Sequence, residues 1–159
     1  MIKTTFTPLP EDRYLEDYKE GDIYAFGPIR ITEDEIIEFG KKFDPQVFHI
    51  DPIKAKDTVY GGLIASGWHT TSLFMRLYVE HYLPGAASLG SPGVDELRWI
   101  KPVRPGDSLM LRITVRKVKP STTKPDRGVL FSFCEMVNQD HEVVSTLTAL
   151  NLIRYRGRF

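Results

Sequence analysis

The sequence has little cysteine, no long apolar run and no excess of either charge. Cys134 is the only cysteine among 159 residues, so the chain can form neither an internal disulfide nor a cysteine-based metal cluster. No run approaches the ~18–20 apolar residues that cross a bilayer, and residues 1–10 lack the apolar stretch of a signal peptide. Lysine and arginine number 21, as do aspartate and glutamate, so the basic surplus of a nucleic-acid or anionic-membrane binder is missing. We therefore expect a cytoplasmic protein that binds neither nucleic acid nor membrane.

The chain shows no internal repeat, no low-complexity tract and no linker that would divide it. We expect a single domain over 1–159. Its first part, 1–20, is polar and contains Pro8 and Pro10, which suggests an arm lying over the surface.

Two helices and a short strand are predicted in the first half of the chain. The strand covers about 22–26. Thr32 and Glu35 have the spacing of a capping box, which starts a helix that should end near Phe43. A longer helix is expected over 68–83, and its apolar residues cover nearly all of its sides. Such a helix is expected to be buried on most faces.

The second half of the chain has the alternation of strands. The expected strands are 97–103, 107–119, 129–138 and 142–154. The clearest apolar face is formed by Leu109, Leu111, Ile113 and Val115. A long helix followed by antiparallel strands predicts an α+β fold in which a curled sheet buries the helix. The sheet edges left open invite a second copy, so we expect a homodimer or a higher homo-oligomer of dimers.

Asp44 and His49 are the first candidates for chemistry. They lie five positions apart in a turn-rich segment that neither helix nor strand periodicity organises. A carboxylate and an imidazole can divide acid and base duties at neutral pH. Three other readings stay open on spacing alone: Asp44 as a turn cap, His49 as a core residue, or a metal site that includes Asp51.

A loop with three glycines leads into the long helix. Gly61 and Gly62 favour a tight turn. Gly67 is the first residue before the helix, where free backbone N–H groups can bind an oxyanion. For Gly67, a turn and an oxyanion site are equally good explanations.

Three ordered segments, 44–49, 60–70 and 95–107, together resemble the MaoC-like, (R)-specific enoyl-CoA hydratase family of hot-dog-fold proteins. The resemblance covers about 20–155. It implies a hot-dog fold, in which a curled antiparallel sheet wraps a central helix. It also implies a hydratase or dehydratase that adds or removes water across the 2,3 double bond of an enoyl thioester. The substrate would be an acyl-CoA, with coenzyme A entering only as part of it and no separate cofactor or metal.

The resemblance also implies roles for single residues. Asp44 and His49 would hold and activate the water, and the N–H of Gly67 would stabilise the thioester oxygen. Substrate-binding residues would be Ser72, Ser66, Trp68, Gly62 and Gln46. The chain departs from the commoner motif, which has Gly before the aspartate and Asn-Pro within the step. Phe43, Gln46 and Val47 stand there, which puts the substrate in doubt more than the reaction.

Two further functions stay open. One is a non-catalytic acyl-thioester-binding protein. The other is a hot-dog acyl-CoA thioesterase, in which the catalytic carboxylate commonly lies on or beside the central helix. The long helix predicted here carries only Glu80, close to its C-terminal end, which argues against the thioesterase.

Overall fold

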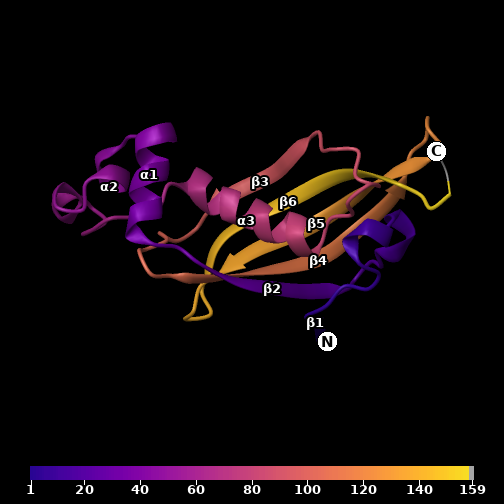
Figure 1. Ribbon diagram of the computed structural model, residues 1–159, viewed down its shortest axis with the longest axis horizontal. Coiled ribbons are helices and arrows are strands. Elements are labelled where there is room, and N and C mark those ends of the chain that lie inside the picture. The colour runs from indigo at the N-terminus through magenta and orange to yellow at the C-terminus, as the bar shows by residue number, and fades with distance from the viewer. Residues whose placement is uncertain (158–159) are drawn as a thin grey trace.

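The computed structural model describes residues 1–157 as a six-stranded sheet with one long helix packed along it (Figure 1). The strands are β1 (Ile2–Lys3), β2 (Ile23–Arg30), β3 (Gly93–Trp99), β4 (Ser108–Pro120), β5 (Arg127–Val137) and β6 (Val143–Arg154). The helices are α1 (Glu33–Phe43), α2 (Val47–Ile50) and α3 (Gly67–His81). The order in the sheet is β1-β2-β4-β5-β6-β3, antiparallel throughout except for the parallel pair β1–β2. The predicted α+β architecture is confirmed.

The inner face of the sheet supplies most of the core. On β4, the predicted apolar face of Leu109, Leu111, Ile113 and Val115 is buried, at no more than 1% exposure for any of the four. Period-2 alternation fixes which side of a strand faces inward, so this part of the prediction needed only the sequence.

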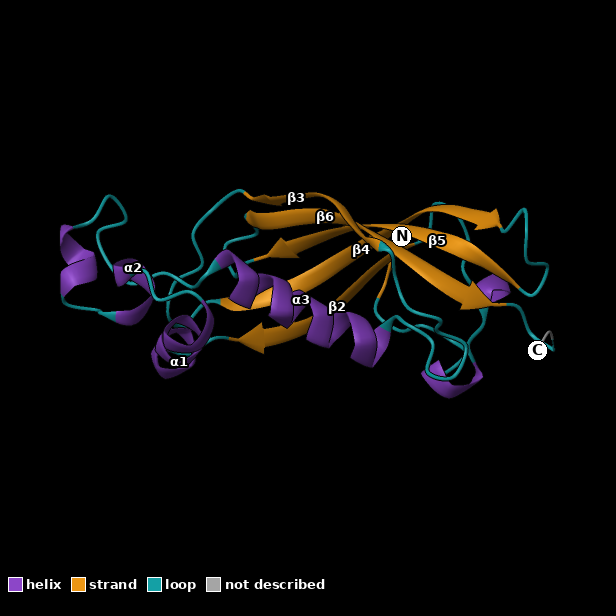
Figure 2. Cartoon of the chain, turned by 90° about the horizontal axis from the view of Figure 1, so that it is seen from above, coloured by secondary structure: helices purple, strands orange, loops and turns teal. Residues whose placement is uncertain are grey.

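Helix α3 crosses the inner face of the sheet (Figure 2). It buries Phe74, Leu77 and Tyr78 against the strands. Its opposite face is open, with Trp68, Met75 and Val79 exposed by 56%, 44% and 50%. The prediction of a helix buried on most faces was therefore wrong for the single chain, because apolar composition does not say whether the sheet or another surface covers a face.

Two buried phenols fix α3 to the sheet beneath it. The hydroxyl of Tyr78 donates to Asn151 Oδ1 on β6 at 2.7 Å. The hydroxyl of Tyr82, just after the helix, is hydrogen bonded to Ser132 Oγ on β5 at 2.9 Å. Buried polar groups of this kind cost free energy unless they are paired, so the two bonds define where the helix sits along the strands.

Two strand boundaries differ from the prediction. β2 continues past Phe26 to Arg30, because an irregularity in its pairing between Phe26 and Ile29 accommodates Gly27 and Pro28. The predicted strand stopped before these two residues, but glycine and proline also occur at strand bulges. β3 covers Gly93–Trp99 rather than 97–103, with its own irregularity between Asp95 and Arg98.

Helix α1 begins as predicted. Thr32 Oγ1 accepts from Glu35 N at 3.2 Å, and Glu35 Oε2 accepts from Thr32 N at 2.8 Å. Helices α1 and α2 gather at the end of the molecule where α3 begins (Figure 1). No helix within 1–157 is both long enough and apolar enough to cross a bilayer.

The segment 1–20 lies at the other end of α3 and contributes to the core. Phe6, Leu15 and Tyr18 are buried, and the hydroxyl of Tyr18 donates to the Tyr82 carbonyl at 2.6 Å. The segment predicted as a surface arm is therefore also a structural part of the fold.

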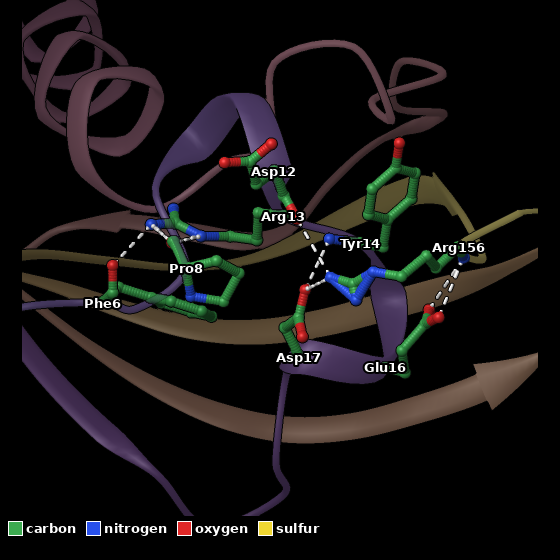
Figure 3. A network of polar contacts seen from close by, with 8 residues as sticks. All are labelled: Phe6, Pro8, Asp12, Arg13, Tyr14, Glu16, Asp17 and Arg156. Carbon is green, nitrogen blue, oxygen red and sulfur yellow. Dashed lines mark hydrogen bonds and ion pairs between the residues drawn. The ribbon is translucent and has the colours of Figure 1, made fainter.

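Arg13 anchors that segment (Figure 3). Its side chain is 1% exposed, and its five N–H groups donate to main-chain carbonyls at 2.7–3.1 Å. The acceptors are Phe6, Pro8, His81 and Tyr82. The last two lie at the C-terminal end of α3, where a cation also complements the helix dipole. Burial lowers the pKa of Arg13, but every donor of the guanidinium is satisfied.

Candidate active site

Asp44 and His49 meet at the N-terminal end of α3. Asp44 is the C-cap of α1, and its Oδ2 lies 3.2 Å from His49 Nε2. His49 is 5% exposed and belongs to the short helix α2. The prediction that the loop brings both groups to one point is confirmed. The prediction that no helix organises the segment was wrong, since a single turn of helix is too short to show periodicity.

The main chain fixes the orientation of the His49 ring. Its Nδ1 lies 2.7 Å from the carbonyl oxygen of Ile64, and the N–H of Ile64 donates to the Phe48 carbonyl at 2.9 Å. A carbonyl only accepts, so Nδ1 carries the proton that is shared in this bond. In the neutral ring, Nε2 is then a free lone pair directed at the carboxylate.

Asp44 is held by two further side chains. Ser66 Oγ donates to its Oδ2 at 2.8 Å, and Gln46 Nε2 donates to its Oδ1 at 2.9 Å. Partial burial disfavours the charged carboxylate, but these bonds and the charge of His49 outweigh it, so the pKa of Asp44 lies below its ordinary value. Asp44 is therefore a carboxylate at neutral pH.

The dyad lies in a cavity of about 670 Å³. Most of the residues that line it are apolar or aromatic, and its polar residues are Asp44, Gln46, His49, Thr70 and Lys101. The lining comprises Phe43, Asp44, Gln46, Phe48, His49, Tyr60, Ile64, Ala65, Gly67, Trp68, Thr70, Trp99, Ile100, Lys101, Pro102, Val103 and Val144. An apolar pocket with a few convergent polar groups is typical of a small-molecule site.

The other predicted site residues divide into two groups. Gly67, Trp68 and Gln46 line the cavity with the dyad. Ser66 is fully buried behind Asp44, where it also accepts from Trp68 N at 3.3 Å as the N-cap of α3. Ser66 therefore positions the carboxylate, and it does not line the cavity. Its assignment to substrate binding stays a prediction.

Ser72 and Gly62 are not among the cavity-lining residues within 1–157. The hydroxyl of Ser72 donates to the Trp68 carbonyl at 2.8 Å, one helical turn back. A side chain at Gly62 would meet only the Arg104 guanidinium, at 3.5 Å. Neither residue lines the cavity, and motif spacing alone does not show which way a helix or turn residue points. Their assignment to substrate binding stays a prediction.

Gly67 lines the cavity, and Trp99 packs against it too closely for any side chain at this position. A Cβ at this position would lie 2.3 Å from Cδ2 and Cε2 of Trp99. No residue within 1–157 accepts a hydrogen bond from the Gly67 N–H, which is the first of α3. Of the two explanations left open by the sequence, the oxyanion site has the support of this free N–H. Close packing against Trp99, which the sequence did not show, explains the glycine in place of a turn.

Several wall residues were not predicted as site residues, although three of them lie in the segment 95–107 that carries the resemblance. Trp99, Ile100 and Val103 reach the cavity from the end of β3 and the loop after it, and Val144 from β6. They lie more than thirty positions beyond the dyad in the chain. That segment was their only signal, and it does not show which of its side chains reach the cavity.

Asp51, the third member of the alternative metal site, is used by the main chain. Its Oδ1 accepts from Ile53 N and from Lys54 N, both at 3.0 Å. Within 1–157 no three His, Cys, Asp or Glu side chains come together as a metal site would require.

A second histidine, His69, is buried beside the site on α3. It is 7% exposed, stacks on Phe39 with ring centroids 4.6 Å apart, and its Nδ1 has no hydrogen-bond partner within 1–157. Burial lowers the pKa of His69 below 6.5, against a smaller opposing effect of Glu35. Below that pH, His69 binds a proton in the unfolded chain but not in the folded chain. The free energy of unfolding therefore falls as the pH falls.

We expect wild type to lose stability from pH 6.5 down through the folded-state pKa of His69, by at most about 1.4 kcal/mol per pH unit from this residue. Urea unfolding at several pH values, beside His69→Phe, measures it. The variant keeps an aromatic ring against Phe39 and should have the flatter profile. Parallel profiles for the two proteins would contradict the assignment.

Comparison with known proteins finds a family profile and solved structures that are described as MaoC-like. The profile described as "MaoC like domain" matches residues 19–130. A protein of Bacillus subtilis (strain 168), called uncharacterized protein YdeM, is 28% identical over 125 residues, covering 79% of this chain and 87% of its own. A crystal structure of a MaoC-like dehydratase from Rhodospirillum rubrum superposes with a TM-score of 0.84 at 39% identity, covering 91% of this chain and 98% of that one.

A more distant structure shares the fold. It is the unliganded R-hydratase PhaJ1 from Pseudomonas aeruginosa, with a TM-score of 0.72 and 22% identity. The match covers 90% of this chain and 86% of that one.

Proposed function

Because the chain belongs to the MaoC-like domain family of hot-dog dehydratases, we propose that it adds or removes water across the 2,3 double bond of an enoyl thioester, with Asp44 and His49 as its acid–base pair. The observation that carries the proposal is the dyad itself, a charged carboxylate and a tautomer-fixed imidazole 3.2 Å apart in a cavity lined mainly by apolar and aromatic residues.

The proposed chemistry follows from the two acceptor atoms that face one another. Asp44 Oδ2 and the Nε2 lone pair of His49 can each accept one hydrogen from a single water. That water presents its oxygen to C3 of the enoyl group. As the oxygen bonds to C3, one of its protons passes to the dyad and a proton from the dyad reaches C2, so one water is added in all. Dehydration is the reverse.

The electrons displaced from the double bond move onto the thioester oxygen. Gly67 offers its N–H to that oxygen, at the N-terminus of a 15-residue helix whose dipole favours negative charge there. We propose that this interaction holds the carbonyl and stabilises the enolate. Ser66 and Gln46 act through Asp44, by keeping its two oxygens oriented and charged.

The alternative of a thioesterase has little support from the position of Glu80. Its carboxylate pairs with Arg76, and Glu80 lines a separate groove with His81 rather than the dyad cavity. We propose an acyl-CoA as substrate in preference to a carrier-protein thioester, with coenzyme A entering only as part of it.

We also propose that the protein is at least a homodimer. Trp68, Met75 and Val79 form an exposed apolar stripe on α3, and β3 is the free edge of the sheet with Val94 exposed by 44%. Pairing of β3 with a second copy would satisfy its free main-chain groups and bring apolar surface together. Sedimentation equilibrium at micromolar protein should give twice 18.2 kDa or more. A mass of one chain would contradict the dimer.

The test of the reaction is the loss of conjugated-enoyl absorbance when purified protein is mixed with crotonyl-CoA, followed together with the release of free thiol. Loss of absorbance without thiol supports the hydratase. Thiol release would identify a thioesterase. Tight binding of several enoyl-CoA thioesters with neither change would identify a non-catalytic binder and overturn the proposal.

A further inference from the structure

We propose that Trp99 is a specificity-determining residue, whose indole restricts the bulk allowed beside the thioester carbonyl and so selects acyl groups unbranched at C2. The inference rests on the proposed function, because it takes the Gly67 N–H as the place where the carbonyl binds. It concerns a residue that lies 55 positions beyond Asp44 and enters the cavity from the far edge of the sheet.

The first observation is the contact between the indole and Gly67. Three atoms of the six-membered ring of Trp99 lie 2.3–2.8 Å from the position of a Cβ on Gly67. The ring therefore packs against the Cα of Gly67, which is one bond of ~1.46 Å from the nitrogen. A thioester whose oxygen accepts from that N–H has its carbonyl carbon next to the indole, and C2 is bonded directly to that carbon.

The second observation is that the indole is held in place. Its Nε1 donates to Thr71 Oγ1 at 3.2 Å, and the Thr71 hydroxyl donates in turn to the Gly67 carbonyl at 2.9 Å. Trp68 packs edge-on against the ring, with centroids 5.1 Å apart and an interplanar angle of 79°. The main chain of Trp99 pairs with Ser145 on β6. The indole is therefore held by a hydrogen bond, by ring packing and by the pairing of its backbone. A substrate substituent that occupied the position of the ring would have to break these contacts.

The third observation concerns the chemistry of the wall. A methyl group at C2 makes the acyl group wider next to the thioester carbonyl. The indole of Trp99 lies on one side of this position and the dyad belongs to another part of the cavity wall, so the added methyl group has little room. A misfit of one methyl group in an apolar pocket typically changes specificity by ~10–200-fold.

The experiment compares kcat/KM for crotonyl-CoA with that for its 2-methyl derivative in wild type, Trp99→Ala and Trp68→Ala. We expect the ratio of 2-methyl to unbranched substrate to rise ~10-fold or more in Trp99→Ala. Trp68→Ala removes the edge-on contact but leaves the indole beside Gly67. Its ratio should therefore rise less than that of Trp99→Ala. An unchanged ratio in Trp99→Ala, with crotonyl-CoA still turned over, overturns the inference.

A second readout separates this inference from the proposed function. Calorimetry gives Kd for the saturated thioesters butyryl-CoA and 2-methylbutyryl-CoA, which need no turnover. Preference for the unbranched thioester in wild type, lost in Trp99→Ala, supports the role of Trp99 even if no enoyl-CoA is hydrated. Equal preference in the two proteins overturns that role even if hydration is fast. Trp99→Phe serves as the milder variant if the alanine protein does not fold.

Discussion

Replacing His49 by alanine is expected to lower kcat for the hydration of crotonyl-CoA by ~10²–10⁴-fold, the range of a general acid–base group. The reason lies in the geometry of the ring. Its Nδ1 is hydrogen bonded to the Ile64 carbonyl at 2.7 Å, so Nε2 is the only ring atom that can exchange a proton with water. Without the imidazole, Asp44 would have to act alone, because His49 is its only partner in the dyad. Initial rates of enoyl absorbance loss measure the effect.

The same assay on Asp44→Asn tests the other half of the dyad. Asparagine keeps the shape of the side chain and can still accept from Ser66, but it removes the charge. We expect a loss of the same order, with melting temperatures of both variants close to that of wild type. Wild-type rates in both variants would show that the chemistry takes place elsewhere, whatever the affinity of the cavity for thioesters.

Replacing Arg13 by methionine is expected to destabilise the fold by about 3 kcal/mol or more. Methionine fills similar space but leaves the carbonyls of Phe6, Pro8 and His81 without the donors they now use, and leaves the Tyr82 carbonyl with the Tyr18 hydroxyl alone. Each buried acceptor left unsatisfied costs about 1–3 kcal/mol, with some relief from water entering at the part-buried positions. For a chain of this size the loss corresponds to a fall in Tm of roughly 6–12 °C.

The matched control is Arg156→Met, the same change at the other arginine of the network in Figure 3. Arg156 bonds to Asp17 at 2.8 Å, but its side chain is 47% exposed. An exposed ion pair contributes about 0–1 kcal/mol, so this variant should melt within a few degrees of wild type. Equal melting temperatures for the two variants, read by circular dichroism, would refute the structural role of Arg13. Arg13→Lys, which keeps the charge with fewer donors, should fall between wild type and the methionine protein.

The strands and the dyad were within reach of the sequence, because each depends on a local pattern. The alternation from Leu109 to Val115 reports directly on which side of β4 is buried. The capping box of Thr32 and Glu35 places the start of α1, and so the position of Asp44 at its end. The resemblance to a family then linked Asp44 to His49, which spacing alone left undecided.

Features that depend on packing between distant segments were out of reach. Arg13 lies in a polar stretch and was interpreted as part of a surface arm, yet its partners are carbonyls, which every residue has and no pattern displays. Trp99 forms the cavity wall because β3 returns to the N-terminus of α3, a matter of sheet order. The exposed face of α3 could not be predicted either, since an apolar residue in the sequence does not indicate whether the sheet or another surface covers it.

The network around Arg13 also bears on the order of events during synthesis. Arg13 leaves the ribosome long before His81 and Tyr82, and Glu16 and Asp17 leave long before Arg156. The first twenty residues therefore cannot form these hydrogen bonds until the end of α3, and then Arg156 after β6, have emerged from the ribosome. Docking of this segment is a late, non-local step, and closing such long loops makes folding slow. Until it docks, Phe6, Leu15 and Tyr18 present apolar surface to a chaperone or to another nascent chain.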